Sequence, residues 1–142
     1  MTDLVRYSML IDGDWCQASD NRSFESINPA TGKAWATVPE ATADDIVRAV
    51  RAAHVAGTTG PWAGMLPTER GKCLMRLADL LAEASENLGR IETIDTGKMF
   101  KETRWQAKYI AEFLRFYGGA ADKVSGDTLP IDKPDMFVFT RR

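Results

Sequence analysis

Histidine and cysteine are scarce in this chain of 142 residues, which has one histidine, His54, and two cysteines, Cys16 and Cys73. The cysteines lie in unrelated contexts, which is typical of free thiols in a reducing cytoplasm rather than of a disulfide framework. These three side chains are too few for a structural zinc site unless carboxylates complete it. His54 falls on a predicted helix and is expected at or near the surface, so Ser/His/Asp catalysis would need residues from a partner.

Long runs of one residue type are also missing. No Lys/Arg-rich run occurs and the formal net charge is −2, which argues against a nucleic-acid-binding surface. No apolar stretch approaches the roughly 20 residues that a membrane helix needs. The N-terminus, Met1–Arg6, has an early acidic residue and no apolar core, so no secretory signal is predicted and the expected location is cytoplasmic. The P-loop and G-x-G-x-x-G patterns that bind phosphates are absent from the sequence.

The first forty residues predict two β-hairpins. The apolar run 8–11 leads into Asp12-Gly13, a dipeptide that favours a tight hairpin turn. A second pair of strands within 24–38 reverses through the segment 29–33. In that segment a proline presets φ and a glycine can adopt positive φ, as a turn requires.

From Thr42 the hydrophobic period changes, which predicts helices. Thr42 offers an N-cap hydroxyl with Asp45 at N3, and Gly57 is predicted to end this first helix. After a loop over 58–65, Pro67 suits the first position of a second helix. The apolar positions of that helix recur at helical spacing and form one stripe, on which Cys73 is expected to act as a small hydrophobe. The stripe comprises Cys73, Leu74, Leu77, Leu80, Leu81, Ala84 and Leu88.

Two more helices are predicted before the chain returns to strands. A short one passes through Ile91 and Ile94 and ends at Gly97, and a longer one spans about 100–117 and ends at Gly118-Gly119. The longer helix carries four aromatic residues along one side: Trp105, Tyr109, Phe113 and Phe116. A row of this kind is more often core than a ligand-binding wall, because aromatic side chains dominate core burial.

The C-terminal part predicts two strands, 128–131 and 136–140, joined by a polar turn. Residues 136–140 are apolar on both faces, as in a strand that is covered from both sides. Pro130 suits an edge strand because it cannot donate to a ladder, and an unpaired edge is a template for another chain. We therefore expect residues 126–142 to associate with another copy of the chain.

Short motifs follow one another along nearly the whole chain. They are Ile11-Asp12-Gly13-Asp14-Trp15, Asn28-Pro29-Ala30-Thr31-Gly32, Trp62 with Pro67-Thr68-Glu69-Arg70-Gly71-Lys72, Leu77-Ala78-Asp79-Leu80-Leu81, Glu92-Thr93-Ile94-Asp95-Thr96-Gly97-Lys98, Phe116-Tyr117-Gly118-Gly119-Ala120-Ala121-Asp122, Gly126-Asp127-Thr128-Leu129-Pro130-Ile131 and Thr140-Arg141-Arg142. Each motif alone is weak, but in this order and spacing the chain resembles the aldehyde dehydrogenase superfamily.

The resemblance implies an oxidoreductase that converts an aldehyde to a carboxylic acid. In the family a cysteine thiolate attacks the aldehyde, hydride passes to NAD or NADP, and a glutamate-activated water releases the acid. Those catalytic and cofactor motifs come later in the family than the part that this chain resembles, and neither Cys16 nor Cys73 has the nucleophile's context. No catalytic or cofactor-binding residue is therefore expected here, and the isolated chain is expected to be inactive and to bind no NAD or NADP.

The implied fold is α/β, the N-terminal part of the aldehyde dehydrogenase fold. Residues 1–125 would form N-terminal β-hairpins and helices that flank a Rossmann-like cofactor domain, which is incomplete here. Residues 126–142 would begin the oligomerisation arm, and the family forms dimers or tetramers. The expected partners are thus an aldehyde substrate and further copies of the same chain.

The resemblance also implies a cation site and an entrance residue. Some family members bind a monovalent cation through two backbone carbonyls and one aspartate, at positions that match Ser26, Ile27 and Asp95 here. An equal alternative is that Asp95 only caps or salt-bridges a loop. Tyr109 approximately matches a position at the family's substrate entrance.

Two other functions remain open on the sequence alone. The chain could be a non-catalytic interaction module that associates with a full-length enzyme through its arm. It could also be a small binding protein that uses the aromatic helix as a pocket.

Overall fold

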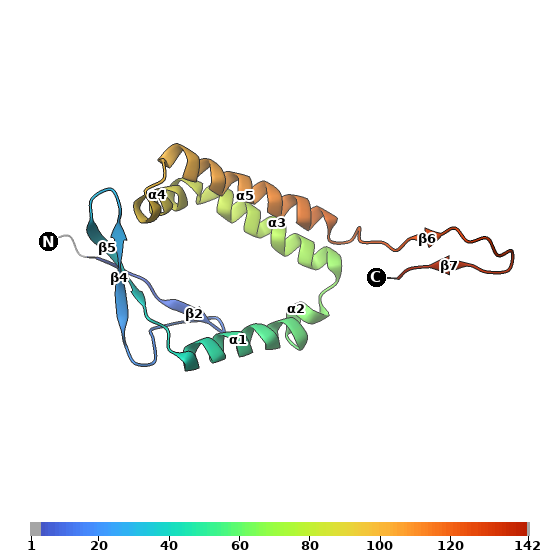
Figure 1. Cartoon of the computed structure of the whole chain (residues 1–142), viewed down its shortest axis with the longest axis horizontal. Coiled ribbons are helices and arrows are strands. Elements are labelled where there is room, and N and C mark those ends of the chain that lie inside the picture. The colour runs from blue at the N-terminus through green and yellow to red at the C-terminus, as the bar shows by residue number, and fades with distance from the viewer. Residues whose placement is uncertain (1–3, 142) are drawn as a thin grey trace.

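The computed structural model describes residues 4–141 of the chain. Met1–Asp3 and Arg142 lie outside the described residues, and with them part of the segment considered for a secretory signal and the last residue of the predicted arm. Along the chain, strands β1 to β5 precede helices α1 to α5, and strands β6 and β7 follow (Figure 1). This order of strands, helices and strands confirms the α/β prediction. Between residues 4 and 141, no helix is both long and apolar enough to cross a membrane.

The first predicted hairpin is confirmed. Strand β2 (Met9–Ile11) pairs antiparallel with β3 (Asp14–Cys16). The two turn residues between them both have positive φ, 56° at Asp12 and 87° at Gly13, which is the requirement of a type I′ turn. A type I′ turn has the twist that the two paired strands need, and Asp-Gly favours this turn type. This is why the dipeptide predicted the hairpin correctly.

The second hairpin is also confirmed and belongs to a small sheet. Strand β4 (Ser23–Asn28) pairs antiparallel with β5 (Lys33–Pro39), and Gly32 in the turn has a φ of 66°. The sheet has a third strand, β1 (Val5–Arg6), which pairs parallel with β5. Its two residues are too few to show an alternating pattern, so the sequence did not predict this strand.

Helix α1 (Ala43–Thr58) begins as predicted. Thr42 is its N-cap, and a capping box joins Thr42 to Asp45 at N3. The helix continues one residue past Gly57, which was predicted to end it. The predicted loop over 58–65 is wrong in part, because it contains the short helix α2 (Pro61–Gly64), whose proline takes the first helical position.

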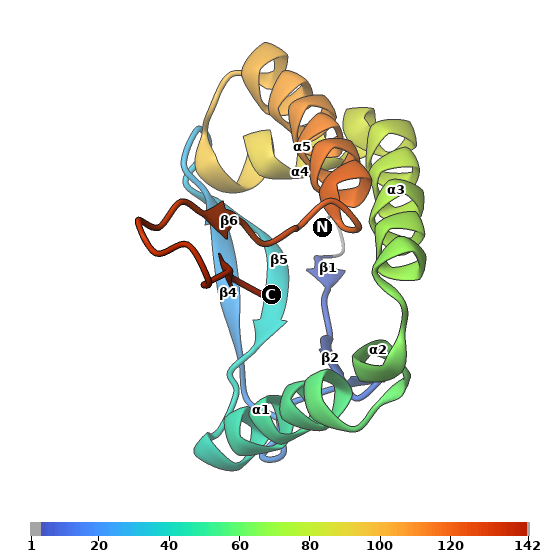
Figure 2. The ribbon, with the colours of Figure 1, turned by 90° about the vertical axis from the view of Figure 1, so that its right-hand side faces the viewer.

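Helices α3 (Pro67–Glu83), α4 (Ser85–Thr96) and α5 (Phe100–Ala120) form a separate unit away from α1 (Figures 1 and 2). Pro67 is at the first helical position, as predicted. Gly97 ends α4 in the left-handed conformation, with a φ of 76°, which is also as predicted. In both views α3 and α5 run side by side, and α4 packs against the beginning of α5.

The contact between these helices is made by small residues. The buried positions of the three helices are Gly71, Ala78, Ser85, Gly89, Thr103, Ala107, Ala111 and Gly118. A Cβ added at Gly71 would lie 2.4 Å from the carbonyl oxygen of Gly118, so α3 and α5 touch backbone to backbone there. The prediction that Gly118-Gly119 ends the helix is therefore wrong. Gly118 lies inside α5 because the close approach to α3 leaves no room for a side chain.

The C-terminal segment, predicted to begin an arm, is a thin hairpin. Strand β6 (Thr128–Leu129) pairs antiparallel with β7 (Val138–Phe139), and the hairpin extends away from the end of α5 (Figure 1). Both strands were predicted, but they are shorter than expected. Phe137 is 73% exposed and Phe139 is 55% exposed, so the two-sided cover expected for this segment is not found among the described residues. No helix or strand among the described residues covers Phe137 or Phe139.

Candidate functional site

Three aromatic side chains form a continuous row on α5. Trp105 and Tyr109 are stacked, with ring centroids 4.8 Å apart and planes inclined by 13°. Tyr109 also meets Phe113 at 5.0 Å, with planes inclined by 87° in an edge-to-face contact. The spacing of four residues places the three rings on one face of the helix, where they touch in sequence. We call these three residues the aromatic row.

The aromatic row is exposed, which corrects the prediction that it belongs to the core. Trp105 is 59% exposed, and Tyr109 and Phe113 are about half exposed. The buried positions of α5 are the small ones, such as Ala107 and Ala111. Close packing against α3 and α4 selects small residues for the inner face, which leaves the large rings outside. Phe116, predicted as a member of the row, instead pairs with Tyr117 at 5.3 Å.

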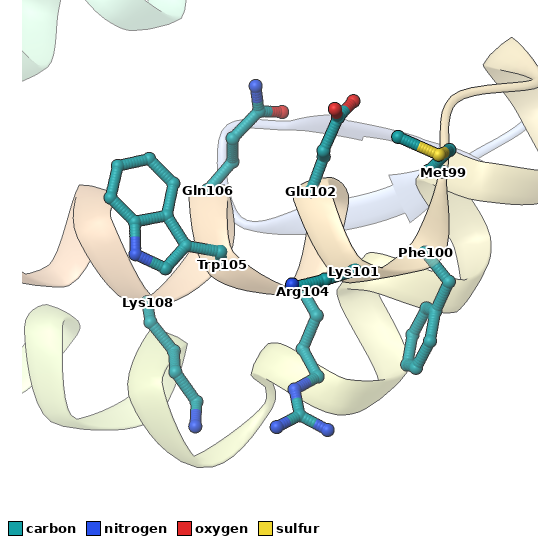
Figure 3. A pocket seen from close by; sticks show the side chains of 8 residues that line it. All are labelled: Met99, Phe100, Lys101, Glu102, Arg104, Trp105, Gln106 and Lys108. Carbon is teal, nitrogen blue, oxygen red and sulfur yellow. The ribbon is translucent and has the colours of Figure 1, made fainter.

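A hollow of about 750 Å³ lies at the beginning of α5. Its lining residues all come from the start of α5 and its cap: Met99, Phe100, Lys101, Glu102, Arg104, Trp105, Gln106 and Lys108. Figure 3 shows Glu102 and Gln106 on one side of the helix, and Phe100, Arg104 and Lys108 on the other. The lining side chains thus project from both sides of α5, and Trp105 is the one member of the aromatic row among them. The periodicity of the sequence predicted the row, but it gave no signal for this hollow.

The predicted cation-site residues lie at the junction of β4 and α4. The Ser26 hydroxyl donates a hydrogen bond of 2.5 Å to Oδ1 of Asp95. The Trp35 indole donates to the same Ser26 oxygen at 3.1 Å. The structure therefore brings the Ser26 side chain next to Asp95 at the end of α4, and the cation site itself stays a prediction. Trp35 was not predicted as part of this junction.

The surroundings of Asp95 contain an irregular stretch of strand and no ion pair with Lys98. A register shift interrupts the β4–β5 ladder between Ser26 and Ile27, and such a bulge disturbs the regular pairing of backbone groups. Asp95 is not paired with Lys98, whose ammonium group lies 2.8 Å from Glu92. In the part of the chain that the structure describes, no three His, Cys, Asp or Glu side chains cluster as metal ligands. Any cation here would depend on Asp95 together with backbone carbonyls.

The scarce nucleophilic side chains lie on elements other than α5. Cys73 on α3 is exposed, so the prediction that it is buried on the apolar stripe is wrong. The inner face of α3 is made by Gly71 and Ala78, and Cys73 falls outside it. Cys16 is half-buried in β3 and lines a hollow of about 350 Å³ between the first hairpin and α1. His54 is exposed on α1, as predicted.

Asp45 is the one fully buried carboxylate among the described residues, and it joins the loop after β3 to α1. The Ser19 hydroxyl donates to it at 2.5 Å, and the Thr42 backbone amide donates at 2.9 Å. These hydrogen bonds, first that of the Ser19 hydroxyl and then that of Thr42, hold the pKa of Asp45 well below its usual value of 3.8. Arg48 adds an ion pair at 3.2 Å. Every acceptor is satisfied, so this carboxylate is structural.

Comparison with known proteins places this fold in a family. The sequence pattern of the aldehyde dehydrogenase family matches residues 15–142. The chain is 50% identical over 113 residues to a (Z)-2-((N-methylformamido)methylene)-5-hydroxybutyrolactone dehydrogenase of Acinetobacter baylyi, which covers 80% of this chain and 23% of that protein. It is 39% identical over 125 residues to the mitochondrial aldehyde dehydrogenase family 2 member B4 of Arabidopsis thaliana, covering 87% of this chain and 23% of that protein.

Solved structures show the same likeness. The NAD⁺ complex of an aldehyde dehydrogenase from Bacillus cereus superposes with a TM-score of 0.86 at 37% identity, covering 96% of this chain and 28% of that chain. An NAD-dependent aldehyde dehydrogenase from Sinorhizobium meliloti gives a TM-score of 0.85 at 32% identity, covering 95% of this chain and 27% of that one. The 142 residues span about a quarter of the length of these relatives. The structural likeness confirms the expected α/β fold. The chain belongs to the aldehyde dehydrogenase family.

Proposed function

We propose that these residues form the N-terminal segment of an NAD(P)-dependent aldehyde dehydrogenase of the cytoplasm, which oxidises an aldehyde to a carboxylic acid. The observation that carries this proposal is the family match over residues 15–142, together with the structural likeness to an NAD⁺-bound relative. Within the proposal, residues 1–125 belong to the cofactor-binding domain and 126–142 begin the oligomerisation arm. The protruding β6–β7 hairpin supports that division.

In this proposal the segment shapes the enzyme and carries no catalytic residue. The nicotinamide cofactor would accept hydride from the substrate. The sequence lacks a glycine-rich phosphate-binding turn, so we assign no residue of the segment to that cofactor. Cys73 lies exposed on α3 and Cys16 is half-buried in β3. Tyr109, in the exposed row, would lie at the substrate entrance.

Activity measurements test the proposal. The protein encoded by the complete reading frame should form NADH or NADPH from an aldehyde, whereas the 142-residue chain alone should form neither and should bind neither NAD nor NADP. Binding energy that stabilises a transition state cannot come from residues that are missing. Turnover by the 142-residue chain that Cys73→Ala abolishes would contradict this assignment and make that thiol catalytic. Absence of aldehyde oxidation in the complete protein would overturn the proposed function itself.

A substrate type is suggested by the Acinetobacter relative. Its name describes a hydroxylated butyrolactone with an exocyclic double bond next to the lactone carbonyl, which is a planar conjugated group. A 5-hydroxylactone is the cyclic form of an aldehyde, so its dehydrogenation fits the same chemistry. We propose a conjugated aldehyde, or its cyclic hydroxylactone, as the substrate class of the complete enzyme.

We also propose that Ser26, Ile27 and Asp95 hold a monovalent cation through two backbone carbonyls and one carboxylate. The Asp95 carboxylate accepts from the Ser26 hydroxyl, which places it beside β4, and the ladder is irregular between Ser26 and Ile27; these two features support this site. In the complete protein, sodium or potassium chloride should raise the melting temperature more than choline chloride at equal ionic strength. Asp95→Ala should remove that difference, and Glu92→Ala, which breaks an exposed ion pair nearby, should leave it unchanged. Equal effects of all three salts on the unaltered protein would remove the site.

The arm is proposed to join copies of the chain. Burying a large apolar side chain contributes about 1.5–3 kcal/mol, and Phe137, Phe139 and Leu129 are all exposed on the hairpin. Sedimentation velocity should show self-association of the 142-residue chain, and a version that ends at Ser125 should sediment as a monomer. If both sediment as monomers over the same concentration range, the arm is not an association element. Binding of the chain to a full-length enzyme without self-association would instead favour the interaction module.

A further inference from the structure

Two of the sequence motifs meet at the base of the C-terminal hairpin, where Gly126 and Asp127 lie beside Thr140. Continuing the register of β6 and β7 by one residue pairs Asp127 with Thr140. The Thr140 amide donates to the Asp127 carbonyl at 2.9 Å, as in a regular antiparallel ladder. The Asp127 amide, however, donates to Oγ1 of Thr140 at 2.8 Å. The threonine hydroxyl therefore takes the place of a backbone acceptor in this pair.

Gly126 is the residue that lets Thr140 come this close. A Cβ added at Gly126 would overlap the carbonyl oxygen of Thr140 and lie 2.7 Å from its carbonyl carbon. Any side chain at position 126 would therefore push the two ends of the hairpin apart. The Thr140 carbonyl lies against Gly126, and the hydroxyl of the same residue accepts from Asp127. The two motifs thus fit each other at the level of single atoms.

Beyond its base, the hairpin is held closed by little else among the described residues. The ladder consists of two residue pairs, and the loop 130–137 separates the strands. A two-stranded hairpin is only marginally stable in water, and closing a longer loop costs more entropy. The rings of Phe137 and Phe139 contact each other, with centroids 5.6 Å apart, and both are exposed. The arrangement of these rings therefore depends on whether the base of the hairpin is closed.

We propose that Thr140 is a positioning residue of the arm, whose hydroxyl closes the hairpin and so prepares its apolar side chains to bind a second copy of the chain. Gly126 makes this closure possible. The inference rests on the proposed association through residues 126–142 and names what prepares that surface. A hairpin that is closed before association loses less conformational freedom on binding. The apparent affinity falls in proportion to the fraction of chains in which the hairpin is closed.

The experiment compares the 142-residue chain with four variants by sedimentation velocity over a range of concentrations. Thr140→Val removes the hydroxyl and keeps the shape, whereas Thr140→Ser keeps the hydroxyl. Gly126→Ala adds the methyl group that would meet the Thr140 carbonyl. Thr128→Val is the matched control, because Thr128 is also an exposed threonine of this hairpin but pairs with Phe139 inside the ladder. Far-ultraviolet circular dichroism checks that the helices of every variant are intact.

We expect Thr140→Val to raise the dissociation constant of self-association about three- to tenfold, because one hydrogen bond of a marginal hairpin is lost. Gly126→Ala should weaken association at least as much. Thr140→Ser and Thr128→Val should each stay within about twofold of the unaltered chain. Association of Thr140→Val that equals that of the unaltered chain would overturn the proposal. A Thr140→Ser chain as weak as Thr140→Val would also overturn it, because the methyl group and not the hydroxyl would then matter.

A second measurement does not depend on association. Hydrogen exchange of the Asp127 amide is followed at a concentration where the chain is monomeric. This amide should exchange several times faster in Thr140→Val than in the unaltered chain or in Thr140→Ser, since its acceptor is lost. Equal protection in all three proteins overturns the proposal even if the chain self-associates. If protection depends on the hydroxyl but the unaltered chain associates at no concentration, the proposed association fails and the closure of the hairpin by Thr140 stands.

Discussion

Helices α1 and α5 are both amphipathic, but they are held in the molecule in different ways. Helix α5 is buried at points along its length, from Thr103 to Gly118, by contacts with α3 and α4. Helix α1 has one buried residue, Asp45, in its first turn. The apolar side chains of Ile46 and Val50 on α1 are more than half exposed. Helix α5 is therefore fixed along its axis, whereas α1 is fixed at its N-terminus.

The difference shows that side-chain size, and not hydrophobicity alone, decides which face of a helix is buried in this chain. The inner face of α5 carries alanine, glycine and threonine because the helices approach closely. The aromatic row on its outer face is larger and more apolar, yet it stays exposed. The largest apolar side chains of α5 therefore lie on the surface of this chain and not in its core.

The largest expected change in stability comes from substituting a glycine at the α3–α5 contact, compared with a glycine in α1. Gly71→Ala should lower the free energy of unfolding by about 2–3 kcal/mol, because its Cβ would meet the Gly118 backbone and the two helices would have to separate. Gly57→Ala in α1 is the matched control, since a Cβ there meets nothing within 4 Å. It should stabilise the chain by up to about 1 kcal/mol through helix propensity. Urea denaturation followed by circular dichroism measures both, and similar changes at the two sites would remove the contrast.

The next effect concerns the buried hydroxyl of α5. Thr103 Oγ1 donates to the Gly89 carbonyl at 2.8 Å and is fully buried. Thr103→Val keeps the shape but leaves that carbonyl without its partner, which should cost about 1–2 kcal/mol. Thr96→Val removes an exposed hydroxyl that donates to Glu92 O, and it should change the stability by less than about 0.5 kcal/mol. A Thr103→Val protein as stable as the unaltered chain would show that the α4–α5 contact depends on packing alone.

A smaller effect is expected at the one anchored end of α1. Thr42→Ala removes the N-cap oxygen that accepts from the Asp45 amide and should cost about 1 kcal/mol. Thr42→Ser should restore the stability, because serine caps equally well. Thermal unfolding of the three proteins checks this. If Thr42→Ser is as unstable as Thr42→Ala, the threonine methyl and not the hydroxyl matters.

The last effect is confined to acid pH. The folded-state pKa of Asp45 is lowered, so its contribution to stability is fully present above the ordinary value of 3.8 and is lost as the pH falls below it. Stability measured from pH 6 downward should therefore decline below about pH 4. Asp45→Asn should show a shallower decline, since it has no proton to take up there. Parallel declines in both proteins would assign the acid sensitivity to other carboxylates.

Local signals predicted the local features of the fold. Asp12-Gly13 fixed the first hairpin, the Thr42–Asp45 box started α1, and Gly97 ended α4, because each depends on a few neighbouring residues. The contact between Gly71 and Gly118 could not be predicted from neighbouring residues, because the two glycines are far apart in the sequence. A glycine that ends a helix and one that packs inside it look alike in the sequence, and only the neighbouring helix distinguishes them.

For the candidate site, the sequence predicted local spacing but not exposure. The spacing of four residues predicted that Trp105, Tyr109 and Phe113 form a row, and the structure confirms their contacts. Periodicity could not tell whether that row faces the core, and the interpretation as core is wrong. Ser26 lies beside Asp95, whereas the Trp35 hydrogen bond to Ser26 has no signature in the sequence.

Hydrogen exchange of the 142-residue chain tests the contrast between α5 and α1 most directly. Amides open to exchange according to the local free energy of unfolding, so protection measures how firmly each helix is held. We expect residues 103–118 of α5 to exchange much more slowly than residues 50–58 of α1. Protection in α1 that equals or exceeds that of α5 would contradict the claim that the small-residue face, and not the larger apolar one, holds this chain together.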